Sequence, residues 1–285
     1  FSFAKVPYGT WIIREIESPK GYVLSEEEIA VTIGKVDEVV EIELVNYFIK
    51  GNIALTKVDE DYPDNKLSGA VFEVYSDTNG DGKLDKDDTL LGEMKELDGG
   101  VYQMSELRFG KYLVKETKAP TGFVLDENVY SVSVEENGKT YTVENKAGVG
   151  FINAAQKGSL KIVKTSSDGK VEGFSFRVTG VDYDQTFKTD KNGEIVIEGL
   201  RIGDYTVSEV SNKASAGYIL PADKQATVKV DATAIVQMHN EFRDTPKTGD
   251  DFNLGLWVSL AALSVVGAGV LGFVGYKNRK KKKED

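Results

Sequence analysis

The chain has 285 residues, a formal net charge of −11 and no cysteine. The acidic balance argues against nucleic acid and anionic lipid as partners, because both bind cationic surfaces. Without cysteine, no disulfide can stabilise the fold. The chain starts at Phe1 with neither a Met nor a secretory segment, so we expect a further region upstream.

The first 241 residues repeat one unit every 85–105 residues or so, about the size of one β-sandwich domain. Its mark is an alternating segment that begins with an aromatic residue, ends in Glu and precedes a Gly-aromatic pair. The segment occurs at residues 11–15, 112–116 and 205–209. Short alternating stretches rich in Val, Ile, Thr and Tyr lie between these marks, as is typical of strands. We therefore predict an all-β fold of tandem Ig-like β-sandwiches.

Three polar residue types recur in phase with apolar strand residues, and alternate residues of a strand share a face. The positions concerned are Glu15, Asn46, Lys57, Glu116, Asn153, Lys164, Glu209 and Asn240. We expect these side chains to point into their sandwich, and Trp11, in phase with Glu15, to lie in the core. His239 is out of phase with Asn240, so we expect it to be exposed.

Buried charges of this kind must pair or become neutral. Burial lowers the pKa of a lysine and raises that of a glutamic acid, so a neutral amine and a neutral acid can coexist. The amine is then a nucleophile and the neighbouring Asn carboxamide an electrophile, while the acid polarises the carboxamide and moves protons. The product is an amide bond between the two side chains. The alternative is an ordinary Lys–Glu ion pair beside a hydrogen-bonded Asn.

An early apolar-x-Lys strand, the Glu segment with its Gly-aromatic turn and a closing Asn resemble the Cna B-type, SpaA-like (prealbumin-like) domains of Gram-positive pilins and adhesins. The resemblance covers most of residues 1–241 and implies prealbumin-like sandwiches closed by intramolecular isopeptide bonds. The implied bonds are Lys57–Asn153 promoted by Glu116, Lys164–Asn240 promoted by Glu209, and a third that uses Glu15, Asn46 and a lysine upstream of Phe1.

Residues 77–88 fit the twelve-residue template of a calcium loop, which places oxygen ligands at fixed positions and Gly at position 6. The ligands would be Asp77, Asn79, Asp81, the main-chain carbonyl of Lys83, Asp85 and Asp88. The flanking residues 71–75 and 90–95 look like strands, so we expect a hairpin insertion. A solvated Asp/Gly turn is the alternative.

The last forty residues carry a short motif, an apolar run and a basic tail, in that order. The motif is Thr245, Pro246, Lys247, Thr248 and Gly249. The uncharged run 254–276 would span about 34 Å as a helix, enough to cross a bilayer. The order resembles the L-P-x-T-G cell-wall sorting signal, with Thr245 in place of Leu. The resemblance implies that a sortase cleaves after Thr248 and joins it to peptidoglycan; a plain membrane anchor is the alternative.

These features predict a cell-wall-anchored surface protein with a rigid stalk of stapled repeats. It would perform only single-turnover isopeptide formation and require no cofactor, and the 77–88 loop would offer a site for calcium. Its partners would be a sortase, peptidoglycan, the membrane before sorting, and a host ligand bound upstream. A minor pilin subunit and the spacer of a surface enzyme are the alternatives. The predicted parts are a truncated domain (1–48), two domains (49–155 and 156–242), the sorting motif and linker (243–251), a transmembrane helix (252–276) and a cytoplasmic tail (277–285).

Overall fold

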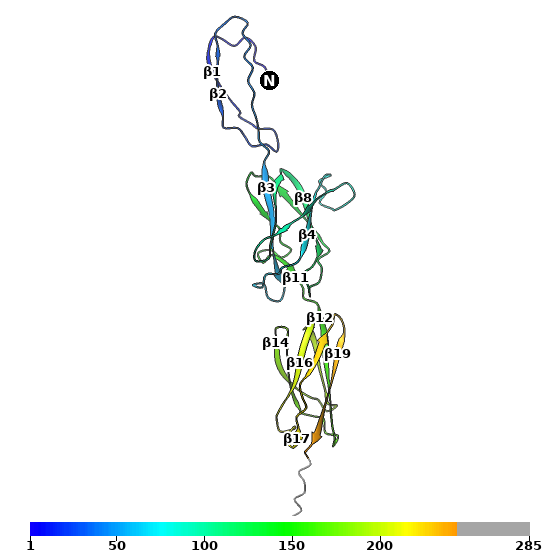
Figure 1. Ribbon diagram of the computed structural model, residues 1–285. Coiled ribbons are helices and arrows are strands. Elements are labelled where there is room, and N and C mark those ends of the chain that lie inside the picture. Colours follow the sequence, from blue (N-terminus) through cyan, green and yellow to red (C-terminus); the bar gives the residue numbers. More distant parts are fainter. Residues whose placement is uncertain (244–285) are drawn as a thin grey trace, which may run out of the picture. The chain divides into compact units, whose positions relative to one another are not determined.

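A computed structural model describes residues 1–243, and every regular element in this range is a β-strand (Figure 1). The predicted all-β class is therefore confirmed for these residues. Within them, the structure contains no helix with the length and apolar character of a membrane span. The transmembrane helix predicted at 252–276 lies outside the described residues.

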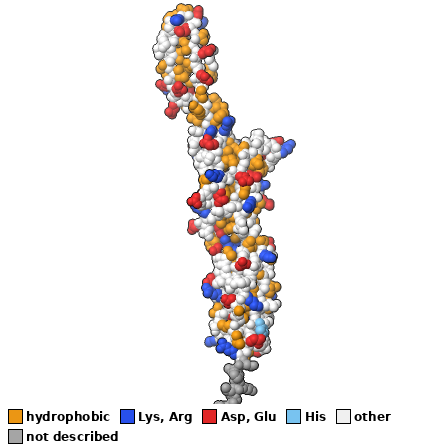
Figure 2. All heavy atoms as spheres, in the orientation of Figure 1, with side chains coloured by type: hydrophobic (Ala, Val, Ile, Leu, Met, Phe, Trp, Pro, Cys, Tyr) orange, Lys and Arg blue, Asp and Glu red, His pale blue; other side chains and the backbone are white. Residues whose placement is uncertain are grey.

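Residues 1–48 contain one antiparallel pair, β1 (Gly9–Arg14) and β2 (Glu28–Ile33), with Trp11 opposite Val31. The prediction that Trp11 lies in the core is wrong, because 43% of it is exposed. In this segment no second sheet packs over the face that carries Trp11. Figure 2 accordingly shows hydrophobic side chains on the outside of the part that holds β1 and β2.

The second repeat is a sandwich of two sheets. Its strands are β3 (Lys50–Asp59), β4 (Val71–Ser76), β5 (Thr89–Glu93), β6 (Lys95–Glu96), β7 (Val101–Arg108), β8 (Gly110–Lys118), β9 (Val129–Val134), β10 (Thr140–Thr142) and β11 (Phe151–Asn153). One sheet has the order β10-β3-β7-β6, with β11 also paired to β3, and the other has the order β5-β4-β8-β9. Both β10 and β11 run parallel to β3, whereas the other pairs are antiparallel.

The core of this sandwich is built on Phe72. Its ring meets those of Tyr102 and Phe151 edge to face, at centroid distances of 5.1 and 4.9 Å. Aliphatic residues such as Leu55 and Val114 fill the space around these rings. Along β3 the buried residues alternate with half-buried ones, which is the period-two pattern expected of a strand, whereas in β8 three consecutive residues are buried.

The third repeat has the same two-sheet plan. Its strands are β12 (Lys157–Ser166), β13 (Ser175–Gly180), β14 (Tyr183–Lys188), β15 (Glu194–Arg201), β16 (Gly203–Val210), β17 (Tyr218–Ile219), β18 (Lys224–Val228) and β19 (Thr233–Phe242). The sheet orders are β15-β12-β19-β17 and β14-β13-β16-β18. In both complete repeats the first strand therefore lies beside the last. This adjacency brings an early lysine close to a closing asparagine.

A tight turn follows the Glu segment in every repeat. Its glycine has a positive φ of 85° at Gly21, 87° at Gly122 and 92° at Gly217. A side chain is strained in this conformation, so glycine is the residue that fits. In the first two repeats the chain then passes the carboxyl group of the preceding Glu, to which a backbone N–H donates.

Candidate functional site

Three polar side chains meet inside the second sandwich. Lys57 on β3 and Glu116 on β8 are fully buried, and Asn153 on β11 is 3% exposed. The parallel pairing of β3 with β11 sets Lys57 opposite Phe151, two residues before Asn153 and on the same strand face. Glu116 reaches them from the other sheet. The predicted inward orientation of all three side chains is confirmed.

The Glu116 carboxyl group holds the other two together. The Asn153 amide nitrogen Nδ2 donates to both carboxyl oxygens at 2.9 Å, and Lys57 Nζ lies 3.9 Å from Oε1. Lys57 Nζ also donates to the Phe151 carbonyl at 3.0 Å. The Asp126 backbone N–H donates to Glu116 Oε2 at 2.8 Å. The amine and the carboxamide, both on one sheet, thus contact a single acid that comes from the other sheet.

Burial shifts both ionisable groups toward their neutral forms. It lowers the pKa of Lys57 from 10.5 to about 8, against the attraction of Glu116. At that pKa roughly a tenth of the amines are unprotonated at pH 7. Burial also raises the pKa of Glu116, and this outweighs the hydrogen bonds from Asp126 and Asn153. Both shifts act in the direction that a neutral amine beside a neutral acid requires.

The third sandwich repeats the arrangement with Lys164 on β12, Glu209 on β16 and Asn240 on β19. Their exposed fractions are 1%, 9% and 0%. Asn240 Nδ2 donates to Glu209 Oε1 at 2.8 Å, and Lys164 Nζ lies over the Phe174 ring, 4.2 Å from its centroid. Burial lowers the pKa of Lys164 and raises that of Glu209. Lys164 Nζ donates to the Thr165 carbonyl, and among the described residues it makes no ion pair with Glu209 like that of Lys57 with Glu116. The third site therefore holds the same three buried groups without the amine–acid contact.

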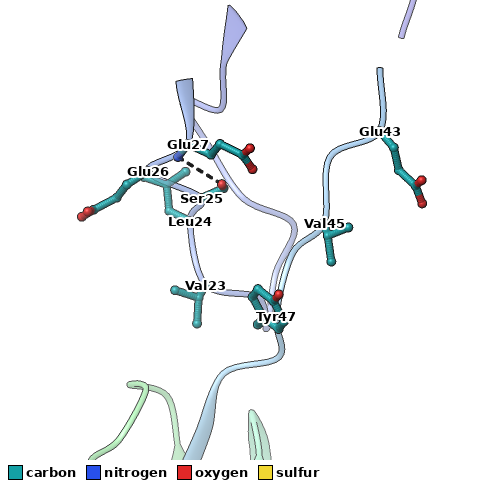
Figure 3. Close-up of a pocket in the computed structure, with 8 residues that line it drawn as sticks. All are labelled: Val23, Leu24, Ser25, Glu26, Glu27, Glu43, Val45 and Tyr47. Atoms are coloured by element: carbon teal, nitrogen blue, oxygen red, sulfur yellow. Dashed lines mark hydrogen bonds between the residues drawn. The ribbon is translucent and has the colours of Figure 1, made fainter. Parts of the chain in front are cut away.

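Residues 1–48 hold two of the three groups. Asn46 Nδ2 donates to Glu15 Oε1 and Oε2 at 2.9 and 2.7 Å, and the Ser25 backbone N–H donates to Oε2 at 2.7 Å. Both side chains are half-buried. Beside this pair lies a pocket between residues 23–27 and 43–47 (Figure 3). Its lining has Glu side chains but no lysine, so it does not complete the set.

Comparison with known proteins decides the family. The model of the SpaA prealbumin-like fold domain matches residues 1–47, 51–147 and 158–242. The chain belongs to the SpaA prealbumin-like family. The sandwiches of the second and third repeats are accordingly SpaA domains. The resemblance inferred from the Lys, Glu and Asn pattern is confirmed. No protein with curated records matches the chain.

Several solved structures are similar to the chain. The TIE protein of Bacillus anthracis is 25% identical, with a TM-score of 0.64 over 84% of this chain and 42% of that one. The minor pilin GBS52 of Streptococcus agalactiae is 17% identical, with a TM-score of 0.32 over 70% and 99% of the two chains. The pilus adhesin SpaC of Lactobacillus rhamnosus GG is 14% identical, with a TM-score of 0.42 over 70% and 32%. This chain thus spans about two-fifths of the TIE protein.

The acidic loop of the first complete SpaA domain lies between β4 and β5, which pair as the predicted hairpin. Its carboxylates bind the loop's own backbone. Asp77 accepts from the N–H groups of Gly80 and Gly82 at 2.7 and 3.1 Å, and Asp88 accepts from Asp85 at 2.8 Å. Residues 1–243 contain no group of three or more His, Cys, Asp or Glu side chains arranged for a metal ion. Calcium binding here stays a prediction.

His239 is exposed on the second SpaA domain, as predicted. It is also part of a short series of polar contacts that strand phase does not predict. Its Nδ1 lies 2.8 Å from Thr165 Oγ1, and its Nε2 lies 3.1 Å from Glu241 Oε1. The residues occupy adjacent strands of one sheet, β12 and β19, and all three are exposed. Thr165, His239 and Glu241 are open to water on a strand face. They therefore lack the enclosed setting in which a hydroxyl becomes a nucleophile.

Two further parts of the SpaA sites were not anticipated. Asp126 and Ser25 contribute backbone donors to the buried Glu116 and the half-buried Glu15. The Asp126 side chain is in turn fixed by Tyr130 and Asn145, at 2.7 and 2.8 Å. Strand alternation carries no signal for a backbone donor ten residues after its acceptor. The sorting motif 245–249 lies outside the described residues.

Proposed function

We propose that this chain is a stalk of a Gram-positive cell-surface protein, in which each complete SpaA domain is closed by a Lys–Asn amide bond. The observation that carries the proposal is the pair of equivalent buried sites, Lys57 with Glu116 and Asn153, and Lys164 with Glu209 and Asn240. Burying a lysine, a carboxyl and a carboxamide in a domain interior costs free energy. Their occurrence together in two interiors therefore favours a functional role. Pilins and adhesins among the solved structures with this fold agree with a surface role.

The reaction uses the three groups that meet at the site. The neutral Lys57 amine attacks Cγ of Asn153, whose Oδ1 has no hydrogen-bond partner among the described residues, and protonated Glu116 then turns its proton to that oxygen as charge develops on it. The Cγ–Nδ2 bond then breaks as Glu116 transfers a proton to the leaving nitrogen and takes one from Lys57. The products are one new Nζ–Cγ amide bond and one ammonia. No oxidant and no metal takes part, and each site reacts once.

Intact mass tests the bonds directly. Because each reaction releases ammonia, we expect the folded chain to weigh two ammonias less than its sequence mass. Digestion should then give two branched peptides, one joining Lys57 to Asn153 and one joining Lys164 to Asn240. A chain at its full sequence mass would refute the proposal and leave the buried groups as ion pairs.

The bonds would make the stalk resistant to pulling. Force that enters a domain at its lysine would leave through its asparagine, because the covalent path is shorter than the path through the sheets. The strands between them would not need to separate. The first and last strands carry the bond in both domains, so the protected length covers most of each fold.

We further propose that residues 245–285 anchor the stalk, with cleavage after Thr248 and transfer to peptidoglycan. The motif, apolar run and basic tail support this order of events. Incubation of the chain with a sortase and an amine nucleophile should give a product that ends at Thr248 joined to the amine. Thr248→Ala should prevent it. Release of the tail at any other residue would contradict the assignment.

A minor pilin subunit is the second candidate, favoured by the ancillary and minor pilins among the matches. The spacer of a surface enzyme is the third. The two differ from a simple stalk in the region upstream of Phe1, which would hold a pilin lysine or a catalytic domain. Isolation of the protein from cell walls separates them: a pilin runs as a covalent ladder of increasing mass, and the others do not.

We also propose that residues 77–88 bind calcium weakly. The template match supports this, although in the structure the side chains of Asp77, Asn79, Asp81 and Asp85 accept from backbone N–H groups of the loop. Calcium should slow proteolysis within 77–88, and the variant Asp81→Asn/Asp85→Asn should lose this protection. Equal cleavage with calcium and with a chelator would identify the segment as a plain turn.

A further inference from the structure

One position differs chemically between the three sites. In each repeat the Gly-aromatic turn continues with an aliphatic residue, a Leu and a fifth residue, in the segments 21–25, 122–126 and 217–221. The fifth residue is Ser25, Asp126 or Pro221. The segments are equivalent in space as well, because the carbonyl of each glycine accepts from the residue three places after the closing Asn. These bonds measure 2.9, 2.8 and 2.7 Å, from Ile49, Gln156 and Arg243.

At this position the first two sites supply a hydrogen bond that the third does not. The N–H groups of Ser25 and Asp126 donate to Oε2 of Glu15 and Glu116, at 2.7 and 2.8 Å. The hydroxyl of Ser25 is turned to the Glu27 N–H instead, so the contact to the acid is made by the main chain (Figure 3). Proline has no N–H to donate. Glu209 Oε2 is correspondingly buried without a hydrogen-bond partner among the described residues.

The missing donor changes which form of the acid is stable. A backbone N–H stabilises a carboxylate more than it stabilises a carboxylic acid. The Asp126 N–H therefore acts to lower the pKa of Glu116, against burial. For Glu209, burial raises the pKa, and only Asn240 and Lys164 act in the opposite direction. The other charged group near this site, Asp168, acts on Lys164 and is held by the Tyr218 hydroxyl at 2.7 Å.

The carboxamide oxygens do not distinguish the two complete sites, because Asn153 Oδ1 and Asn240 Oδ1 are both buried without a hydrogen-bond partner among the described residues. The carboxyl oxygens do distinguish them. Both Glu116 oxygens accept hydrogen bonds, whereas Glu209 Oε2 accepts none from the described residues. An unpaired buried acceptor costs free energy, and a proton on Oε2 would turn it into a donor.

We propose that the fifth residue is a positioning residue that sets the ionisation of the promoting acid, and that Pro221, by withholding the N–H that Ser25 and Asp126 supply, keeps Glu209 protonated to higher pH than Glu116. This inference rests on the proposed isopeptide bonds. If it holds, the Lys164–Asn240 bond would form over a wider alkaline pH range than the Lys57–Asn153 bond. The difference is encoded in the backbone, since the Lys, Glu and Asn are the same.

The test follows bond formation at both sites in one chain. The full chain, recovered unfolded in denaturant, is diluted into buffers of increasing pH, quenched and digested, and the two branched peptides are quantified against time. Rates should be bell-shaped in pH, because the amine must be neutral and the acid protonated. A charge-assisted hydrogen bond is worth enough to move the alkaline limb by about one pH unit.

Substitutions at the fifth position give matched comparisons. Pro221→Ala restores an N–H and should move the alkaline limb of the Lys164–Asn240 bond down by about one pH unit. Asp126→Pro should move the limb of the Lys57–Asn153 bond up relative to Asp126→Ala, which loses the same carboxylate but keeps the N–H. Alkaline limbs that do not respond to either change would overturn the inference.

Failure of the bonds themselves is distinguishable. If neither site releases ammonia at any pH, the proposed function fails, and the ionisation is then measured in the unreactive variants Lys164→Met and Lys164→Met/Pro221→Ala. In carbon-13 NMR titrations of labelled Glu carboxyls, Glu209 should titrate at higher pH in the first variant than in the second. Equal midpoints would overturn the inference independently of the reaction.

Discussion

Replacing Glu116 by Gln should leave Lys57 and Asn153 unjoined and lower the free energy of unfolding of their domain by about 4–5 kcal/mol. Gln fills the space of Glu but has no carboxyl proton to transfer, so ammonia cannot leave. The bond closes a loop of 97 residues, counting both ends from 57 to 153. Loss of a cross-link of this length frees the unfolded chain, which is the main source of the effect. Urea unfolding with intact mass on the same sample measures both.

An exposed acid in the same domain provides the control. Glu106 forms an ion pair with Lys50 at 2.8 Å, and its side chain is 73% exposed. Glu106→Gln should retain the mass deficit and change stability by less than about 1 kcal/mol, as is usual for exposed pairs. Glu209→Gln should prevent the Lys164–Asn240 bond, so this variant should release only the ammonia of the Lys57–Asn153 bond. If Glu116→Gln still lacked two ammonias, Glu116 would have no role in the reaction.

Strand alternation predicted most of the two complete sites. Lys57, Glu116 and Asn153 were predicted to lie in the interior because each is in phase with apolar residues on its own strand. This alternation is a property of the single strand and does not depend on which strands are its neighbours. It did not predict which strands are neighbours. The parallel pairing of β3 with β11 is a long-range contact that strand alternation does not encode, and the Lys57–Asn153 pair was implied only by the family resemblance.

The failures have equally specific causes. Trp11 is in phase with residues predicted to point inward, but alternation shows only which residues share a strand face. In residues 1–48 no second sheet covers that face. The equivalence of Pro221 and Asp126 could be predicted from the sequence, since each lies four residues after its turn glycine, Gly217 or Gly122. The loss of a hydrogen bond to Glu209 could not be predicted, because the acceptor is a side chain on another strand. Backbone donors to buried side chains require coordinates.

The largest pH effect should occur in a chain that cannot react. In Asn153→Ala the amine of Lys57 and the carboxyl of Glu116 stay buried and free to titrate. Lys57 has a pKa of about 8 when folded and 10.5 when exposed, so between these values the unfolded chain binds more protons. Stability must then rise with pH across this window, by about 3 kcal/mol in total.

Glu116 acts in the opposite direction at lower pH. Its pKa is raised by burial, so the folded chain keeps a proton that the unfolded chain has lost, and stability falls as the pH rises above about 4.5. Asn153→Ala should therefore be least stable between the two transitions, which urea unfolding at a series of pH values measures. Lys57→Met/Asn153→Ala should lack the alkaline rise, as should the cross-linked chain, whose Lys57 amine has become an amide. An equal alkaline rise in the double variant would assign it to other lysines and contradict the burial of a free amine at this site.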